Sequence, residues 1–255
     1  MVPIVTATDE RYLPGVLALY NSYLKHSAEG FSFHCLAYGD ESLKRKLEAQ
    51  GIHTILNKYL PVDVLPMSPK YDWYRDKIES AAMYARLMIP DLFSGEKSVY
   101  IDADAVILKS LDGLVSVDMK EHPCAGTVAN GSINTSDVPG CGINHPGICS
   151  SMIVFNHEWW REKNIYNKCL ELMRASNFVF KTVVQGVLSY TLKNDFYKYT
   201  ATHQVHGGHQ QALYSIHLSY VLHFIGTNPW EEYPKHLLPV PEHKEKARSI
   251  WRQYA

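Results

Sequence analysis

Two carboxylates interrupt an apolar stretch near the middle of the chain. The stretch SVYIDADAVILKSL, from Ser98 to Leu111, places Asp102 and Asp104 two positions apart. Burying an unpaired carboxylate is costly, so either the pair is a solvated strand end or something repays its desolvation. At strand spacing both side chains start on the same side of the backbone. They can therefore converge on one divalent cation, with diphosphate oxygens as further ligands.

The segments before this stretch predict how the two acids are positioned. Expected strands at 3–8, 31–39 and 52–57 alternate with expected helices at 13–24 and 40–51, and a helix over 77–90 precedes the acidic stretch. This alternation predicts an α/β fold with a single doubly wound, mainly parallel sheet. In such sheets ligands bind at the carboxyl ends of the strands. Asp102 and Asp104 are expected at that end of an interior strand.

Beyond Lys120 the chain is richer in loops. The segment 130–147 is a long Gly/Asn/Pro/Ser loop, a type that usually serves as a lid or binding loop. A strand at 150–156, helices at 157–176 and 182–192, a His/Gly loop at 201–211, a strand at 220–226 and a terminal helix at 241–254 are expected after it. We predict one domain over 1–255, with a nucleotide-binding half (1–120) and a loop-rich acceptor half that includes the C-terminal helix (121–255).

Composition excludes several classes of protein. The net charge of −1 over 255 residues gives no basic field for nucleic acid or an anionic membrane. Five cysteines without a C-x-x-C argue against a disulfide framework or a structural zinc site. No apolar run approaches about 18 residues, so no transmembrane segment is expected, and the first residues lack the features of a cleavable signal. These features predict a soluble, cytoplasmic protein whose oligomeric state is open.

Five stretches resemble glycosyltransferase family 8, the retaining enzymes that include glycogenin and bacterial galactosyltransferases. They occur in the family's order over roughly residues 2–231: VTATDERYLPGVLALYNSYL, SAAMYARLMIPDLF, VYIDADAVILKSL, VVQGVLSYTL and LHFIGTNPW. The resemblance implies a GT-A fold. It also implies Mn²⁺-dependent, retaining transfer of a hexose, glucose or galactose, from a UDP-sugar to a hydroxyl group of a glycan, glycolipid or protein.

The resemblance also assigns roles to individual residues. Asp102, Asp104 and His223 would hold the metal, and two carboxylates with one imidazole favour Mn²⁺ over Mg²⁺, which is also possible. The catalytic set would be Gln185, Arg86 and Asp104, with Gln185 beneath the anomeric carbon. Residues expected to bind the UDP-sugar and its metal are Ala7, Thr8, Asp9, Tyr12, Arg86, Asp102, Ala103, Asp104, Ser150, Ser151, Gln185, His223, Gly226 and Asn228.

Three departures from the family's pattern bear on these roles. Cys149, Ser150 and Ser151 stand where the family usually has Asn-Ala/Ser-Gly, and Val184 stands where an Asp is expected before Gln185. Both changes bear on the identity of the donor sugar. The closing motif is one residue shorter and has Asn228 in place of a phosphate-binding Lys, which bears on catalytic strength.

Purely structural interpretations compete with several assignments. Asp9 could cap the first helix, Arg86 could lie on a helix surface, and Gln185 could be a satisfied core amide. For His203, His206 and His209 a mobile loop is favoured over a second metal site. Packing is favoured over sugar binding for Trp159 and Trp160, and a solvated helix over a membrane contact for 241–254.

Two other functions stay open at this point. The first is a protein of the same fold that has lost transfer activity and binds sugar nucleotides or a partner. The second is a metal-dependent sugar nucleotidyltransferase. That class generally has a Gly-rich, basic loop after its first strand, and TATDERYLPG lacks one, so it ranks lower.

Overall fold

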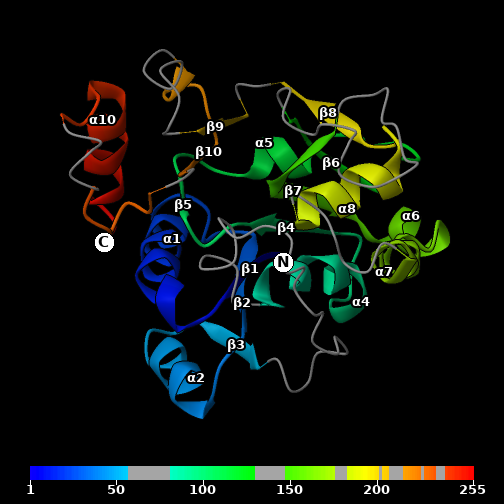
Figure 1. Ribbon diagram of the computed structural model, residues 1–255, viewed down its shortest axis with the longest axis horizontal. Helices are drawn as coiled ribbons and strands as arrows, with labels where there is room; N and C mark the ends of the chain where they lie inside the picture. Colours follow the sequence, from blue (N-terminus) through cyan, green and yellow to red (C-terminus); the bar gives the residue numbers. More distant parts are fainter. Residues whose placement is uncertain are drawn as a thin grey trace.

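A seven-stranded sheet forms the centre of the molecule (Figure 1). The structure, a computed structural model, describes residues 1–56, 81–129, 147–175, 183–200, 203–206, 215–224, 227–233 and 239–255. The strand order is β3-β2-β1-β4-β7-β6-β8, and the pairs β4–β7 and β6–β7 are antiparallel while the others are parallel. The strands are β1 (Val2–Thr8), β2 (Phe31–Ala37), β3 (His53–Leu56), β4 (Lys97–Ile101), β6 (Cys124–Val128), β7 (Ile148–Asn156) and β8 (Tyr197–Tyr199). The predicted mainly parallel α/β sheet is confirmed.

The central strands are apolar on both faces because helices cover both sides of the sheet. Ile4 and Val99 belong to one hydrophobic core, whereas the next residues, Val5 and Tyr100, belong to the other. This alternation is the period of two expected for a strand buried on both faces. The run of apolar residues before Asp102 therefore reflects a strand in the middle of the sheet.

Two groups of helices form the outer layers. α1 (Leu13–His26), α2 (Glu41–Glu48) and α5 (Asp112–Val115) pack on one face. The 3₁₀ helix η3 (Ala81–Met88), α4 (Ile89–Leu92), α6 (His157–Glu162), α7 (Ile165–Ala175) and α8 (Val183–Leu192) pack on the other. A short 3₁₀ helix, η1 (Glu10–Tyr12), links β1 to α1.

A small three-stranded sheet lies beside the large one. It consists of β5 (Ala105–Ile107), β10 (Val221–His223) and β9 (Gln204–His206), with β10 between the other two. The C-terminal helix α10 (Glu242–Trp251) shares a hydrophobic cluster with residues of this sheet and of α1, and Figure 1 shows α10 next to α1. The chain passes from the large sheet to the small one at Asp102–Asp104.

Two expected helices differ from the structure. Over 77–90, the described part is the 3₁₀ helix η3 followed by the short α4. Three residues per turn place Met83 and Arg86 on the same side. The prediction of one continuous helix over 157–176 was also wrong. The helical conformation is interrupted at Lys163–Asn164, where Asn164 has a left-handed φ of 52°.

The second half contains strands that the sequence did not indicate. β6 and β8 were not predicted, and the loop expected over 201–211 contains β9, which pairs parallel to β10. β8 and β9 have three residues each, too few to show a hydrophobic period. The long loop expected over 130–147 lies outside the described residues, except Gly147.

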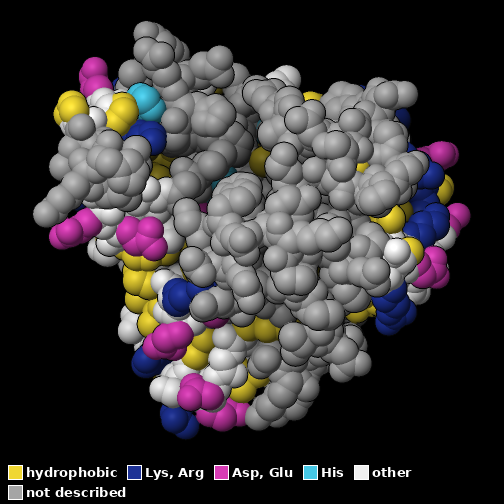
Figure 2. Space-filling model, viewed as in Figure 1, with side chains coloured by type: hydrophobic (Ala, Val, Ile, Leu, Met, Phe, Trp, Pro, Cys, Tyr) yellow, Lys and Arg dark blue, Asp and Glu magenta, His cyan; other side chains and the backbone are white. Residues whose placement is uncertain are grey.

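Charged side chains of both signs lie on the part of the surface that the structure describes. Acidic and basic side chains are interspersed along the right-hand edge of Figure 2, over α6 and α7, as expected for a net charge of −1. Among the described residues, every helix is too short or too polar to cross a membrane.

A buried histidine predicts how stability depends on pH. His157 is fully buried between Ser98 Oγ, 2.8 Å from its Nε2, and the Gly95 carbonyl, 3.1 Å from its Nδ1. Burial, together with Arg161, lowers the pKa of His157 to about 4. Because unfolded histidine titrates near 6.5, the unfolded state binds this proton first. The contribution of buried, neutral His157 to the free energy of unfolding is complete above about pH 6.5 and is lost progressively as the pH falls toward 4.

We expect His157→Gln to flatten this part of the stability profile. Chemical denaturation at several pH values would measure the effect. As the pH falls from 6.5 toward 4, His157 should lower the wild-type free energy of unfolding by up to about 1.4 kcal/mol per pH unit. The exposed His217 provides a control, since His217→Gln leaves the buried site intact. Equal slopes for wild type and His157→Gln would contradict the assignment.

Candidate active site

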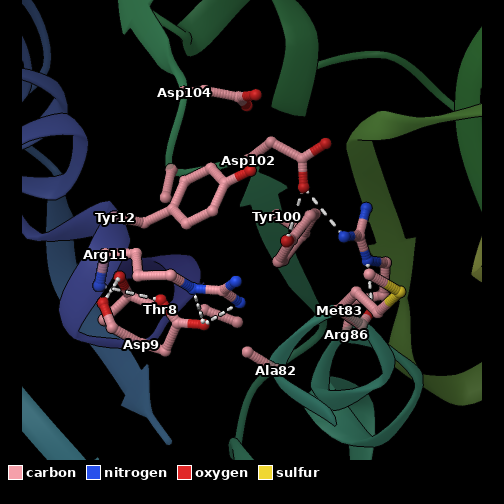
Figure 3. A pocket seen from close by; sticks show the side chains of 12 residues that line it. Thr8, Asp9, Arg11, Tyr12, Ala82, Met83, Arg86, Tyr100, Asp102 and Asp104 are labelled. Atoms are coloured by element: carbon pink, nitrogen blue, oxygen red, sulfur yellow. Dashed lines mark hydrogen bonds and ion pairs between the residues drawn. The ribbon is translucent and has the colours of Figure 1, made fainter. Parts of the chain in front are cut away.

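One pocket collects most of the residues singled out in the sequence (Figure 3). It opens where β1 and β4 end, so the carboxyl ends of two neighbouring parallel strands supply its floor. Its lining residues are Ala7, Thr8, Asp9, Arg11, Tyr12, Ala82, Met83, Arg86, Tyr100, Asp102, Ala103 and Asp104. The ligand-binding position expected for an open α/β sheet is therefore present.

Asp102, Asp104 and His223 come together at one edge of this pocket. His223 Nε2 lies 3.2 Å from Asp104 Oδ1 and 3.7 Å from Asp102 Oδ2, and one ligand atom from each residue lies within 4.8 Å of the others. With metal–ligand bonds of about 2.1–2.3 Å, neighbouring ligands are roughly 3.0–3.3 Å apart. The three side chains fit a single divalent cation after small shifts.

Strand pairing in the small sheet explains why His223 reaches the two acids. β10 runs antiparallel to β5 with His223 opposite Ala105, and the Phe224 amide donates to the Asp104 carbonyl over 3.0 Å. A residue far away in sequence is thereby fixed beside Asp104. Burial lowers the pKa of His223, but the carboxylates of Asp104 and Asp102 outweigh burial, and its pKa is raised.

Asp102 is braced on its other side by two donors. Tyr100 Oη donates to Asp102 Oδ1 over 2.7 Å, and Arg86 Nη2 lies 2.8 Å from the same oxygen. Burial is the main cause that raises the pKa of Tyr100 well above its ordinary value, so the hydroxyl keeps its proton. With Oδ1 occupied in this way, Asp102 offers Oδ2 toward His223.

Arg86 is a buried structural cation and not a surface residue. It is 4% exposed, and its guanidinium lies 4.2 Å from the centre of the Tyr100 ring. Nε donates to the Met83 carbonyl over 2.8 Å and Nη1 to the Ser150 carbonyl over 2.5 Å. Burial lowers the pKa of Arg86, but Asp102 and Tyr100 outweigh burial and raise it. The surface interpretation of Arg86 is wrong.

The backbone of β7 connects this charged group to α8. The Ser150 amide donates to Gln185 Oε1 over 3.3 Å, while the Ser151 carbonyl accepts from the Asp102 amide over 2.9 Å. Gln185 is half-buried and contacts the same backbone that holds Arg86. Gln185 is therefore linked to Asp102 through the Ser150 backbone and Arg86, and its amide oxygen already has a protein partner.

Another part of the pocket lining comes from the β1–α1 connection. Asp9 caps η1, accepting from the Arg11 amide over 3.0 Å, and pairs with the Arg11 guanidinium over 2.8 Å. Asp9 thus caps the short helix η1 and not the expected first helix, because α1 follows Tyr12 without a side-chain cap. Asp9 lines the pocket as well. Burial and the nearby Asp104 carboxylate raise the pKa of Tyr12 to about 12, although a hydrogen bond to the Asn228 side chain opposes them.

The residues that depart from the family's pattern make contacts within the protein. Asn228 Nδ2 donates to Glu231 Oε1 over 2.9 Å, so this amide is held beside Tyr12 by a carboxylate. Val184 is 4% exposed and packs in a hydrophobic core. Cys149 Sγ lies 3.1 Å from Ser151 Oγ. Gly226 lies outside the described residues.

The structure supports packing for Trp160, whereas it gives His203 ordered ring contacts instead of a place in a mobile loop. His203 is stacked between Tyr199 and Tyr220, with ring centroids 4.8 and 5.6 Å away. Trp160 is buried at 1% exposure, as packing requires. His209 and the side chain of His206 lie outside what the structure describes.

Three residues near the site were missed in the sequence. Tyr100 sits in the apolar run before Asp102 and looks like a core residue until its hydroxyl is placed. Arg11 lines the pocket beside Asp9. Gln204 donates to Ser151 Oγ over 2.6 Å from β9, a segment interpreted as a loop. A buried tyrosine two residues before an acid on the same strand was the one available signal.

Comparison with known sequences decides the family. Residues 3–233 match the profile of Glycosyl transferase family 8. The chain belongs to this family. The match covers nearly the whole chain and includes every lining residue of the pocket, and the family resemblance seen in the sequence is confirmed.

Curated members of the family are similar to parts of this chain. The glycosyltransferase GlyB of Streptococcus pneumoniae serotype 4 is 26% identical over 169 residues, 60% of this chain and 39% of GlyB. The lipopolysaccharide 1,3-galactosyltransferase of Salmonella typhimurium is 28% identical over 122 residues, 44% of this chain and 36% of that protein. The aligned regions thus span well under half of both relatives.

Solved structures agree on the fold. The galactosyltransferase LgtC, crystallised with donor and acceptor sugar analogs, superimposes with a TM-score of 0.69 at 17% identity over 100% of both chains. GlyE of Streptococcus pneumoniae TIGR4 gives 0.67 at 18% identity and covers 100% of this chain and 60% of GlyE. The chain has the GT-A fold of these glycosyltransferases.

Proposed function

We propose that this member of family 8 is a retaining hexosyltransferase that uses Mn²⁺ and a UDP-sugar, with glucose or galactose the transferred sugar. The observation that carries the proposal is the convergence of Asp102, Asp104 and His223 at one edge of a pocket. Tyr12 and Asp9, from the β1–α1 connection, line the same pocket. This arrangement suits a nucleoside diphosphate with its phosphates at the metal residues and its base at Tyr12 and Asp9.

The donor set fits Mn²⁺ because it combines two carboxylate oxygens with an imidazole nitrogen. When bound, the ion acts as a Lewis acid that neutralises charge on the departing UDP. Asp102 and Asp104 supply the negative charge that holds it, and Arg86 keeps the Asp102 carboxylate oriented. Mg²⁺ is the alternative that the same residues admit.

The base wall would bind uracil through β1 and η1. Tyr12 offers a ring face to the base, and Asp9 offers a carboxylate whose Oδ1 also caps η1. The backbone of Ala7 and Thr8 lines the same wall. Ser150, Ser151 and Ala103 would contact the donor chiefly through the backbone around the metal residues.

Gln185 would lie near the anomeric carbon. An amide is polar but a poor nucleophile, so it can stabilise oxocarbenium character without forming a lasting covalent bond. The acceptor would be a hydroxyl group of a glycan, glycolipid or protein.

A panel of sugar nucleotides tests the proposal directly. We expect UDP release in Mn²⁺ from UDP-glucose or UDP-galactose when a hydroxyl acceptor is supplied. GDP-linked and CMP-linked sugars should release no GDP or CMP. Tight binding of UDP, with no UDP released from any UDP-sugar, would support the alternative of an impaired sugar-nucleotide-binding protein. Val184 and the Glu231-bound Asn228 favour that alternative. Absence of both binding and release would rule out the proposal.

The stereochemistry of the product is a separate prediction. A retaining enzyme converts an α-configured UDP-hexose into an α-linked product. We expect the anomeric proton coupling in the NMR spectrum of the product to be that of an α-linkage. A β-linked product would contradict the retaining assignment while leaving the metal site unaffected.

A further inference from the structure

Trp230 supports the pocket residue Tyr12 from behind. The two rings meet edge to face, with centroids 5.5 Å apart and an interplanar angle of 80°. Gly15 permits this approach, because a Cβ there would lie 2.6 Å from the Trp230 ring and 2.4 Å from the Ala103 carbonyl oxygen. Trp230 and the Ala103 carbonyl therefore both lie close to the first turn of α1 at Gly15.

Helix α10 holds Trp230 in turn. The Trp230 and Trp251 rings are tilted against each other with centroids 6.0 Å apart. Arg248 Nη2 donates to the Asn228 carbonyl over 3.1 Å and also to the Glu231 carbonyl. Both α10 residues are 7% exposed, so their contacts with the segment 228–231 are shielded from water.

The far end of α10 is fixed to α1, the helix that begins after Tyr12. Asn21 Nδ2 donates to the Tyr254 carbonyl over 2.8 Å, and His26 Nε2 lies 2.9 Å from Tyr254 Oη. The last residues of the chain are thus bound to the helix that presents Tyr12. The segment 228–231 contacts both helices, through Trp230 at Gly15 of α1 and through Arg248 and Trp251 of α10.

We propose that Trp230 and Arg248 are positioning residues that set the orientation of the Tyr12 ring for stacking on a planar base. The inference rests on the proposed function, because it assumes that Tyr12 meets the base of UDP. A ring stacks well only in a narrow range of orientations. Tyr12 contacts Trp230 on one side and Asn228 on another, and Arg248 binds the Asn228 carbonyl. Loss of either support would let the ring tilt.

Two probes separate positioning of Tyr12 from general support of the site. UDP engages both the base wall and the metal residues, whereas inorganic pyrophosphate engages only the latter. We expect Trp230→Leu and Arg248→Met to weaken UDP binding in Mn²⁺ about tenfold and to change pyrophosphate binding less than twofold, by calorimetry. Trp230→Phe, which keeps an aromatic edge, should recover most of the UDP affinity.

Matched controls and a double-mutant cycle complete the test. Trp159→Leu and Arg252→Met alter a tryptophan and an arginine outside this group of contacts and should change neither affinity. In the Tyr12→Leu background, Trp230→Leu should cause no further loss of UDP affinity. Circular dichroism and thermal unfolding would show whether each variant is folded. If Trp230→Leu does not fold, Arg248→Met alone carries the test.

Four outcomes would overturn the inference. An equal loss of UDP and pyrophosphate affinity would mean that Trp230 and Arg248 support the whole site. Unchanged UDP affinity in both variants would mean that Tyr12 does not depend on them. If wild-type protein binds pyrophosphate but not UDP, the assumption about Tyr12 fails, and if it binds neither, the proposed function fails.

Discussion

Asp104→Asn is expected to weaken Mn²⁺-dependent UDP binding by two orders of magnitude or more. Asp104 Oδ1 is one of the three ligand atoms around the expected ion, 3.2 Å from His223 Nε2. Replacing a carboxylate with an amide removes a full negative charge from a partly buried site, where charges interact more strongly than in water. Binding of UDP would be measured by calorimetry with and without Mn²⁺.

The same substitution should change metal-free thermal stability only slightly. An amide at this position would remove the pairing with His223 but also the repulsion between two neighbouring carboxylates, and these effects oppose each other. Asp118→Asn, at an exposed position away from the pocket, is the matched control and should leave UDP binding unchanged. Unaltered UDP affinity of Asp104→Asn in Mn²⁺ would refute the metal assignment.

The strands and helices before residue 57 were predictable because most of them are long and regular. β1, β2, α1 and α2 show clear hydrophobic periods, and Asp40 and Gly51 mark the limits of α2, with Gly51 at a φ of 84°. The ends of β1 and β4 then place Asp9 and Asp102 at one edge of the sheet by topology alone. Eight of the expected binding residues line that pocket.

The small sheet and the polar contacts around the pocket depend on pairings that no local pattern records. β5, β9 and β10 are three-residue strands from distant parts of the chain, and their pairing is what brings His223 beside Asp104. Family resemblance suggested His223, whereas its spacing in the sequence did not. Tyr100 and Gln204 were missed for a related reason. Each is a polar group in a buried strand, and its partner is known only once neighbouring strands are aligned.

Arg86 shows how the two kinds of information combine. The sequence places it in a helical, mostly apolar segment, where a surface position was a reasonable alternative. The structure buries it because three acceptors surround it: Asp102 Oδ1 and the carbonyls of Met83 and Ser150. Arginine suits this position since its planar guanidinium can donate in several fixed directions while stacking on an aromatic ring.

Arg86→Met is therefore expected to be the most destabilising single change near the pocket. Removing one partner of a buried ion pair leaves the other charge uncompensated, which typically costs about 3–5 kcal/mol. Asp102 would keep the Tyr100 hydroxyl as a donor but lose its counter-charge, and two backbone carbonyls would lose their donors. Urea denaturation without metal should show a loss of that order in the free energy of unfolding.

Arg86→Lys distinguishes charge from geometry. A lysine ammonium keeps the positive charge but cannot reach all three acceptors at once, so we expect it to recover only part of the stability. Arg11→Gln, which removes a more exposed cation from the same pocket, should have little effect on unfolding.

The metal site should respond to Arg86 through the orientation of Asp102. Measured well below the unfolding temperature, Mn²⁺ affinity should fall in Arg86→Met and less in Arg86→Lys, because a freed Asp102 carboxylate can turn away from His223. A variant that unfolds at the wild-type urea midpoint and binds Mn²⁺ as tightly would show that Arg86 does not brace Asp102. In that case the remaining explanation for its burial would be direct contact with the donor, and the loss in Arg86→Met would appear only in UDP-sugar binding.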